Sequence, residues 1–115
     1  MKTIKLNNDQ SVTVNPKINA LVMKKLRDNE GFKTKLIIGA MIKQEEIDEF
    51  VLIDAVFLAY RQANPNGMKY ENFLEKYDLD IEEAAPILMA VISKKGRQKF
   101  AEGFEKRTNK KKQTG

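Results

Sequence analysis

The chain contains no cysteine, no histidine and no tryptophan. Without cysteine there can be no disulfide bond, no thiol nucleophile and no thiolate metal site. Without histidine there can be no imidazole-bound zinc and no catalytic site built on an imidazole base. Any general acid or base would have to be a carboxylate, a lysine or a tyrosine. The sequence therefore predicts a protein that is not an enzyme, with no catalytic residue, no metal ligand and no cofactor.

Long apolar segments are also missing. The two longest runs cover residues 36–42 and 50–60, and Asp54 interrupts the second. Neither run approaches the roughly 20 apolar residues that a membrane-spanning helix needs. The first six residues lack the apolar stretch of a secretory signal. We expect a soluble, cytoplasmic protein that makes no contact with a membrane.

The 115 residues suffice for one ordinary domain, and their charge is unevenly distributed. Residues 1–93 carry 12 basic and 14 acidic side chains, whereas residues 94–115 carry nine basic and two acidic ones. We predict a single globular domain over residues 1–104 and a disordered tail over residues 105–115, because this tail has no apolar residue. The tail is either a solubilising extension or a phosphate-binding segment. Its basic residues are Lys106, Arg107, Lys110, Lys111 and Lys112.

The first fifteen residues predict a β-hairpin. Ile4 and Leu6 share one face of an extended segment, and Val12 and Val14 share one face of another. Residues 7–10 between them are of the types that form turns. A hairpin with one apolar face is marginally stable alone, so we expect this face to pack against helices.

The rest of the chain predicts helices. Asn15 and Pro16 suggest a helix start, with Asn15 as the N-cap. Further helices are expected over residues 32–43, 45–63 and 70–77, and after Asp80, which begins a capping-box pattern with Glu83. Pro86 either kinks the last helix or starts a new one. The expected fold is α+β and mostly α-helical, with a hairpin at residues 1–15 and four or five packed helices within residues 16–104.

The helix over residues 45–63 is expected to form the centre of the domain. Between residues 50 and 60 only Asp54 is polar, which predicts a helix buried on nearly all sides. No side chain three or four residues away can pair with Asp54. Because an ionised carboxylate is not left unpaired in a core, we expect either a partner from elsewhere in the fold, such as Lys or Tyr, or a surface opened to another chain.

Two patterns that resemble functional sites are better explained by structure. Carboxylates cluster at residues 45–49 and 82–83, where predicted helices begin and negative charge is favoured. Residues 62–73 have a superficial likeness to a calcium-binding loop around Gly67. The twelfth position of that loop is Phe73 instead of glutamate, so a helix–turn–helix connection is the better interpretation.

The segment after the central helix carries a resemblance to a known family. It has the pattern A-Y-x-x-A-N-P at residues 59–65, then Y-x-x-F-L at residues 70–74 and an acidic turn at residues 78–80. These motifs resemble those of the tail assembly chaperones of long-tailed phages and prophages of Gram-positive bacteria. The hairpin and the size of the chain also look like that family, so the resemblance covers about residues 1–95.

The resemblance implies a function without catalysis. Such a chaperone would bind the long, helical tape measure protein and keep it soluble in the host cytoplasm until the tail tube assembles around it. It would be absent from the mature particle. Two alternatives stay open at this point: a small nucleic-acid-binding regulator that uses the basic C-terminal segment, and a structural subunit of a prophage tail.

Four aromatic residues near the turn at residues 64–67 are the candidates for partner binding or self-association. They are Phe57, Tyr60, Phe73 and Tyr77. Amphipathic helices bind by placing an apolar stripe into a hydrophobic groove, and these residues could line one. The alternative is that all four are ordinary core residues.

Overall fold

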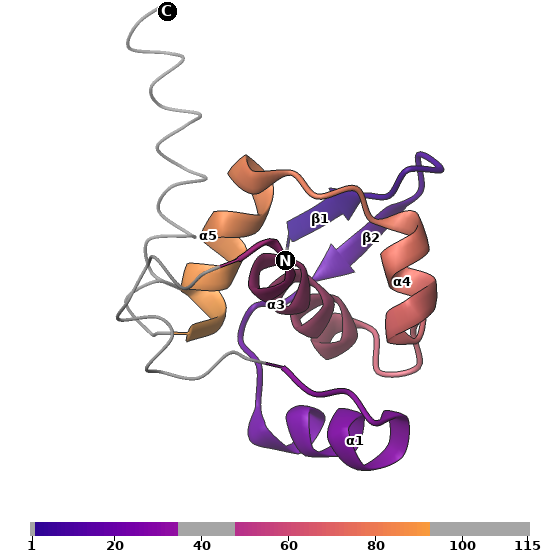
Figure 1. Ribbon diagram of the computed structural model, residues 1–115, viewed down its shortest axis with the longest axis vertical. Coiled ribbons are helices and arrows are strands. Elements are labelled where there is room, and N and C mark those ends of the chain that lie inside the picture. Colours follow the sequence, from indigo (N-terminus) through magenta and orange to yellow (C-terminus); the bar gives the residue numbers. More distant parts are fainter. Residues whose placement is uncertain (1, 35–47, 93–115) are drawn as a thin grey trace, which may run out of the picture.

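The computed structural model describes residues 2–34 and 48–92 (Figure 1). Within these residues, strands β1 (Lys2–Lys5) and β2 (Ser11–Val14) are followed by helices α1 (Ala20–Glu30), α3 (Glu49–Ala63), α4 (Tyr70–Lys76) and α5 (Ile81–Ile92). The predicted α+β, mostly helical fold with an N-terminal hairpin is confirmed. A helix was expected from residue 32, but residues 32–34 are not helical. The remainder of that predicted helix, and everything predicted beyond residue 92, lies outside the described residues.

The two strands form an antiparallel hairpin in which Ile4 lies opposite Val12 and Lys2 opposite Val14. Ile4, Leu6 and Val14 are buried, so the predicted apolar face exists and belongs to the core. The backbone also ties the hairpin to α3, because the N–H of Asn15 donates to the carbonyl of Ala59 at 2.8 Å. Packing on a helix stabilises a hairpin that would be marginal alone.

Helix α3 is the central element, and in Figure 1 it lies between α4 and α5. From Val51 to Arg61 every side chain except that of Ile53 is buried, as the apolar pattern predicts. Asp48 caps its N-terminus, accepting a hydrogen bond from the N–H of Val51 at 2.9 Å. The elements packed around α3 therefore share one continuous core.

The predicted start of the first helix at Asn15 and Pro16 is wrong. Helix α1 begins at Ala20, and Asn19 is its cap, accepting from the N–H of Val22. Asn15 instead closes a local turn by accepting from the N–H of Lys17. A contact from α3 contributes to the later start, because the N–H of Asn19 donates to the side-chain oxygen of Gln62 at 3.1 Å.

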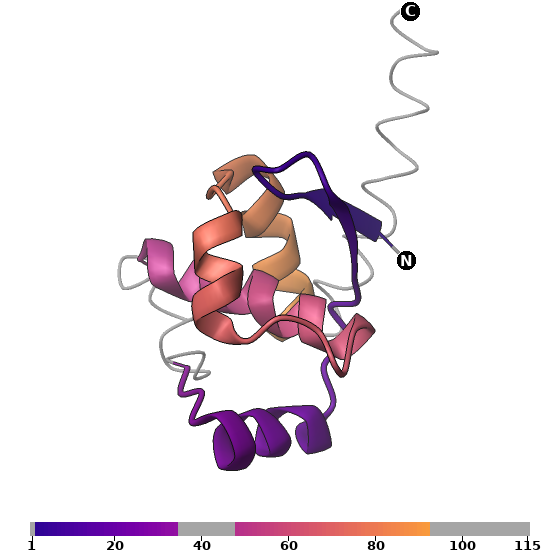
Figure 2. The ribbon, with the colours of Figure 1, turned by 90° about the vertical axis from the view of Figure 1, so that its right-hand side faces the viewer.

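Helix α1 ends at Gly31, which has the left-handed φ of 67°. Its N–H donates to the carbonyl of Arg27, and the N–H of Phe32 donates to that of Leu26. This arrangement is the αL helix ending for which glycine is favoured. It turns the chain back, and Phe32 enters the core. In both Figure 1 and Figure 2, α1 lies at the periphery, to one side of the other elements.

Helix α5 continues through Pro86, so no new helix starts at this proline. Pro86 has no N–H to donate to the carbonyl of Glu82, so one hydrogen bond of this helix is missing. Asp80 caps the first turn, as predicted, by accepting from the N–H groups of Glu82 and Glu83. The capping box is not closed in the usual way, because the Glu83 carboxylate accepts a hydrogen bond from Tyr77.

Candidate partner-binding surface

The four candidate aromatic residues lie in the core. Phe57 and Phe73 are fully buried, and Tyr60 and Tyr77 expose 5% of their surface. Stacked rings join Phe73 to Tyr60 at 5.3 Å and to Tyr77 at 5.2 Å between centroids. The predicted surface patch is therefore not formed, and the core interpretation of these residues is correct. The physical reason is that α4 folds over α3, so that the two aromatic stripes face each other instead of solvent.

The turn after α3 is closed by the Tyr60 side chain. Its hydroxyl accepts a hydrogen bond from the N–H of Met68 at 2.8 Å. A Cβ atom placed on Gly67 would lie 2.5 Å from this hydroxyl oxygen, nearer than real Cβ atoms approach other atoms. A side chain at this position would force the Tyr60 ring to shift, so the A-Y-x-x-A-N-P motif and Gly67 form one packed unit. The Asn64 side chain adds to this unit by donating to the carbonyls of Thr13 and Tyr60.

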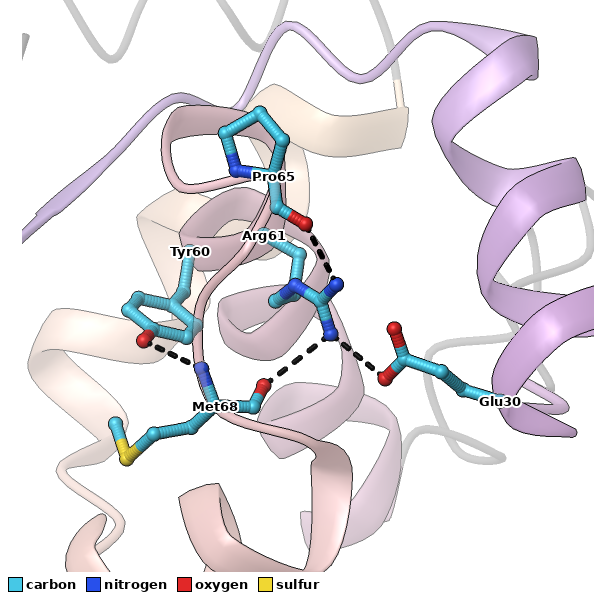
Figure 3. Close-up of polar contacts among 5 residues, drawn as sticks. All are labelled: Glu30, Tyr60, Arg61, Pro65 and Met68. Carbon is cyan, nitrogen blue, oxygen red and sulfur yellow. Dashed lines mark hydrogen bonds and ion pairs between the residues drawn. The ribbon is translucent and has the colours of Figure 1, made fainter.

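Arg61 connects three parts of the chain, as Figure 3 shows. Its Nη1 donates to the Glu30 carboxylate at 2.7 Å and to the carbonyl of Met68 at 3.2 Å. Its Nη2 donates to the carbonyl of Pro65 at 2.8 Å. The guanidinium group therefore holds the end of α1 and both sides of the turn at residues 65–68. The sequence pattern gives no sign of this role, because an arginine at the end of a helix usually faces solvent.

The Arg61–Glu30 pair is largely shielded from water. The Arg61 side chain is 8% exposed and that of Glu30 is 18% exposed. The guanidinium carbon also lies 5.9 Å from the centre of the Phe57 ring, within the range of a cation–π interaction. Nε of Arg61 is buried and makes no hydrogen bond with the described residues. Removing either charge would leave the other without its partner in a poorly solvated place.

Asp54 has a partner of the predicted kind. The hydroxyl of Tyr70 donates to its carboxylate at 2.6 Å, so a tyrosine from α4 reaches the buried charge on α3. Burial raises the pKa of Tyr70, and the hydrogen bond and negative charge of Asp54 raise it further. This contact serves the packing of α4 on α3, and it leaves no need for a second chain at Asp54.

A second tyrosine–carboxylate contact joins α4 to α5. The Tyr77 hydroxyl donates to the Glu83 carboxylate at 3.3 Å. Burial is the main cause that raises the pKa of Tyr77, and the charge of Glu83 adds to it. The pKa of Glu83 is also raised, first by burial and then by the charge of Asp80, although Tyr77 and Lys2 act in the opposite direction.

The polar side chains of the calcium-like segment are used in structural contacts. The Gln62 side chain accepts from the N–H of Asn19, and the amide group of Asn64 donates to two backbone carbonyls. In residues 2–34 and 48–92, no three Asp or Glu side chains come together in a group that could hold a metal ion. Helix–turn–helix is thus the structure of this segment.

Five large apolar side chains are exposed among residues 2–34 and 48–92. They are Leu21, Met23, Phe50, Ile81 and Met89. Two of them lie on α1, whose only buried residue is Leu26. Leu21 is 58% exposed. None of these exposed side chains belongs to the four aromatic residues of the predicted patch.

A groove, called the α1 groove below, runs along one side of α1 and has a volume of about 360 Å³. Helix α1 contributes Ala20, Met23, Lys24 and Arg27, and the other lining residues are Phe32, Lys33, Thr34 and Leu58. Phe32 and Leu58 are buried and form the floor, and Met23 is a partly exposed wall. Three of the eight lining residues are cationic and none is acidic, which gives the groove an apolar interior and a basic rim.

The predicted basic tail residues all lie outside the described residues. No helix in the part of the chain that the structure describes has both the length and the apolar character needed to cross a membrane. Neither a protein-family model, nor a curated protein, nor a solved structure matches the chain.

Proposed function

We propose that this protein is a tail assembly chaperone of a long-tailed phage or prophage. Its partner would be the tape measure protein, which it would keep soluble in the host cytoplasm until the tail tube assembles. The observation that carries the proposal is the pair of motifs at residues 59–65 and 70–74, which resemble those of this chaperone family.

The place of these motifs in the fold supports the proposal. Tyr60 and Asn64 of the first motif form the hydrogen bonds that close the turn after α3. Tyr70 and Phe73 of the second motif face α3 through the Asp54 contact and the aromatic core. The resemblance therefore lies in a three-dimensional unit, α3–turn–α4, and not in scattered surface positions.

The chemistry of the chain is also compatible with a binding role. The charged residues that the structure describes in the core, Asp54 and Arg61, both make structural contacts. An exposed apolar side chain such as Met23 belongs to the kind of surface that holds an apolar partner. The proposal therefore assigns the protein a role in assembly, and no role in the finished particle.

Co-expression with the long helical protein encoded beside it tests this function. We expect the tape measure protein to be soluble and to co-purify with the chaperone, and to aggregate when it is expressed alone. Mass spectrometry of mature tails should find the tape measure protein and not this chain. Insolubility of the tape measure protein in both cases, or the presence of this chain in mature tails, would contradict the proposal. Salt-sensitive DNA binding by the purified chain would favour the regulator instead.

A further inference from the structure

We propose that the α1 groove binds an amphipathic helix whose apolar stripe is flanked by acidic side chains. This inference rests on the proposed function and deepens it, since the helix would belong to the tape measure protein. None of the four aromatic residues that the sequence suggested lines this groove.

The spacing of the lining residues suits a helical partner. Ala20, Met23, Lys24 and Arg27 occupy positions i, i+3, i+4 and i+7, so they form one face of α1. Phe32 and Leu58 lie beneath this face as an apolar floor. A partner helix recognised in this way inserts side chains spaced by three and four residues. The groove volume of about 360 Å³ accommodates a few such side chains and not a whole helix.

The charge of the groove specifies the partner further. Lys24, Arg27 and Lys33 line it, and no Asp or Glu does. Neither Lys24 nor Lys33 forms an ion pair with a described residue, whereas Arg27 pairs with Asp28 at 3.0 Å. Residues 1–93 carry more acidic than basic side chains, so three cations around one apolar groove are a local departure from the net charge of that part of the chain. Acidic residues beside an apolar stripe would complement this rim.

The groove is held open by contacts at one end of α1. The left-handed Gly31 directs Phe32 into the core, where its ring lies 5.1 Å from that of Phe57. The ion pair between Glu30 and Arg61 fixes the last turn of α1 to α3. Preformed walls lower the entropic cost of binding, because fewer groups must be ordered when the partner arrives.

The other side of α1 provides matched controls. Leu21 and Lys25 line a separate groove that also contains Glu30 and several amide side chains. Met23→Glu and Leu21→Glu therefore place the same new charge on opposite sides of one helix. Two double variants each reverse two exposed charges: Lys24→Glu/Lys33→Glu and Lys17→Glu/Lys25→Glu. Only the first pair of lysines lines the α1 groove.

The experiment uses the full chain and two probes. The first is the co-expressed tape measure protein. The second is a synthetic helix-forming peptide with a leucine stripe flanked by glutamates, compared with the same peptide carrying lysines. We expect the wild-type chain to prefer the acidic peptide, and the preference to weaken as salt is added. Met23→Glu and Lys24→Glu/Lys33→Glu should each weaken binding of both probes at least about tenfold, which corresponds to about 1.4 kcal/mol. The two control variants should bind like the wild type.

Several results would overturn the inference. One is equal binding of acidic and basic peptides, and another is unchanged binding of both probes by the folded groove variants. If these same variants lose binding to an oligonucleotide, the groove is a nucleic-acid site instead. If they lose self-association in sedimentation, the groove binds a second copy of the chain. If the acidic peptide binds as expected but the tape measure protein does not, the groove stands and the proposed function fails. Circular dichroism of each variant establishes that it is folded.

Discussion

The ring of Tyr60 lies against Gly67 so closely that no side chain fits between them. An added Cβ atom would lie 2.5 Å from the tyrosine hydroxyl oxygen, and its next nearest neighbours would be ring carbons at 2.7 Å and 2.9 Å. Because the same hydroxyl accepts from the N–H of Met68, the ring cannot move away without breaking that hydrogen bond. The turn between α3 and α4 is thus built around one aromatic side chain.

We expect Gly67→Ala to lower the free energy of unfolding by about 1–3 kcal/mol, as forced overpacking does. Urea denaturation measures this loss. The control is Asn66→Ala, one residue earlier in the same turn, where the side chain is exposed and the change should be small. Gly67→Ala with the stability of the wild type would mean that the Tyr60 ring does not occupy this place.

The Arg61–Glu30 pair should contribute far more than the exposed pair Arg27–Asp28. Arg61→Met would leave Glu30 and the carbonyls of Pro65 and Met68 without their donor, so we expect a loss of about 3 kcal/mol. Arg27→Met, in a pair whose side chains are 63% and 46% exposed, should cost less than about 0.5 kcal/mol. If Arg61→Met and Arg27→Met lower the free energy of unfolding by similar amounts in thermal or urea denaturation, the burial of Arg61 does not strengthen its interactions.

Asn7 connects the tip of the hairpin to the end of α4. Its backbone N–H donates to the carbonyl of Lys76 at 2.8 Å, and its side chain donates to that of Glu75 at 2.9 Å. These carbonyls belong to the last turn of α4, which has no intrahelical donor for them. Asn7→Ala should therefore cost about 1 kcal/mol. Asn8→Ala is the comparison, because its side chain bonds only within the turn. Equal effects of the two changes would exclude a capping role for Asn7.

Stability should fall in alkaline solution because of Tyr70 and Tyr77. Both have a folded-state pKa above the ordinary tyrosine value of 10.0, mainly because they are buried. A group whose pKa is raised by folding stabilises the folded protein fully at pH values below its pKa in the unfolded chain. This stabilisation is lost as the pH rises through its pKa in the folded protein. We therefore expect the unfolding free energy to decrease above pH 10. Tyr77→Phe should reduce this slope, and a slope that does not change would contradict the assignment.

The sequence pattern was sufficient for elements whose burial is decided locally. The hairpin face of Ile4 and Val14 and the apolar surface of α3 follow directly from side-chain periodicity. The tyrosine partner of Asp54 was also among the expected kinds, because a buried carboxylate requires a donor. These features depend on chemistry that every fold must satisfy.

The errors concern contacts between distant segments. Asn15, followed by Pro16, carries a good local signal for a helix start, but the helix is capped by Asn19. One of the contacts at this true start is with Gln62, 43 residues away. Spacing identified an aromatic stripe on α3 and another on α4, but it could not show that each covers the other. Met23 and Lys24 gave no signal at all, because the α1 groove is formed only when Phe32 and Leu58 meet beneath them.

Helix α1 buries a single residue, Leu26, and its end is fastened to α3 through Glu30. Opening of such a helix exposes less apolar surface than opening of α3 does, so it costs less free energy. Its amide hydrogens should therefore exchange with solvent deuterium well before those of α3. A partner helix bound in the α1 groove would slow the exchange of the α1 amides toward the rate of those in α3. Hydrogen exchange would therefore report binding in this groove as protection of α1 alone.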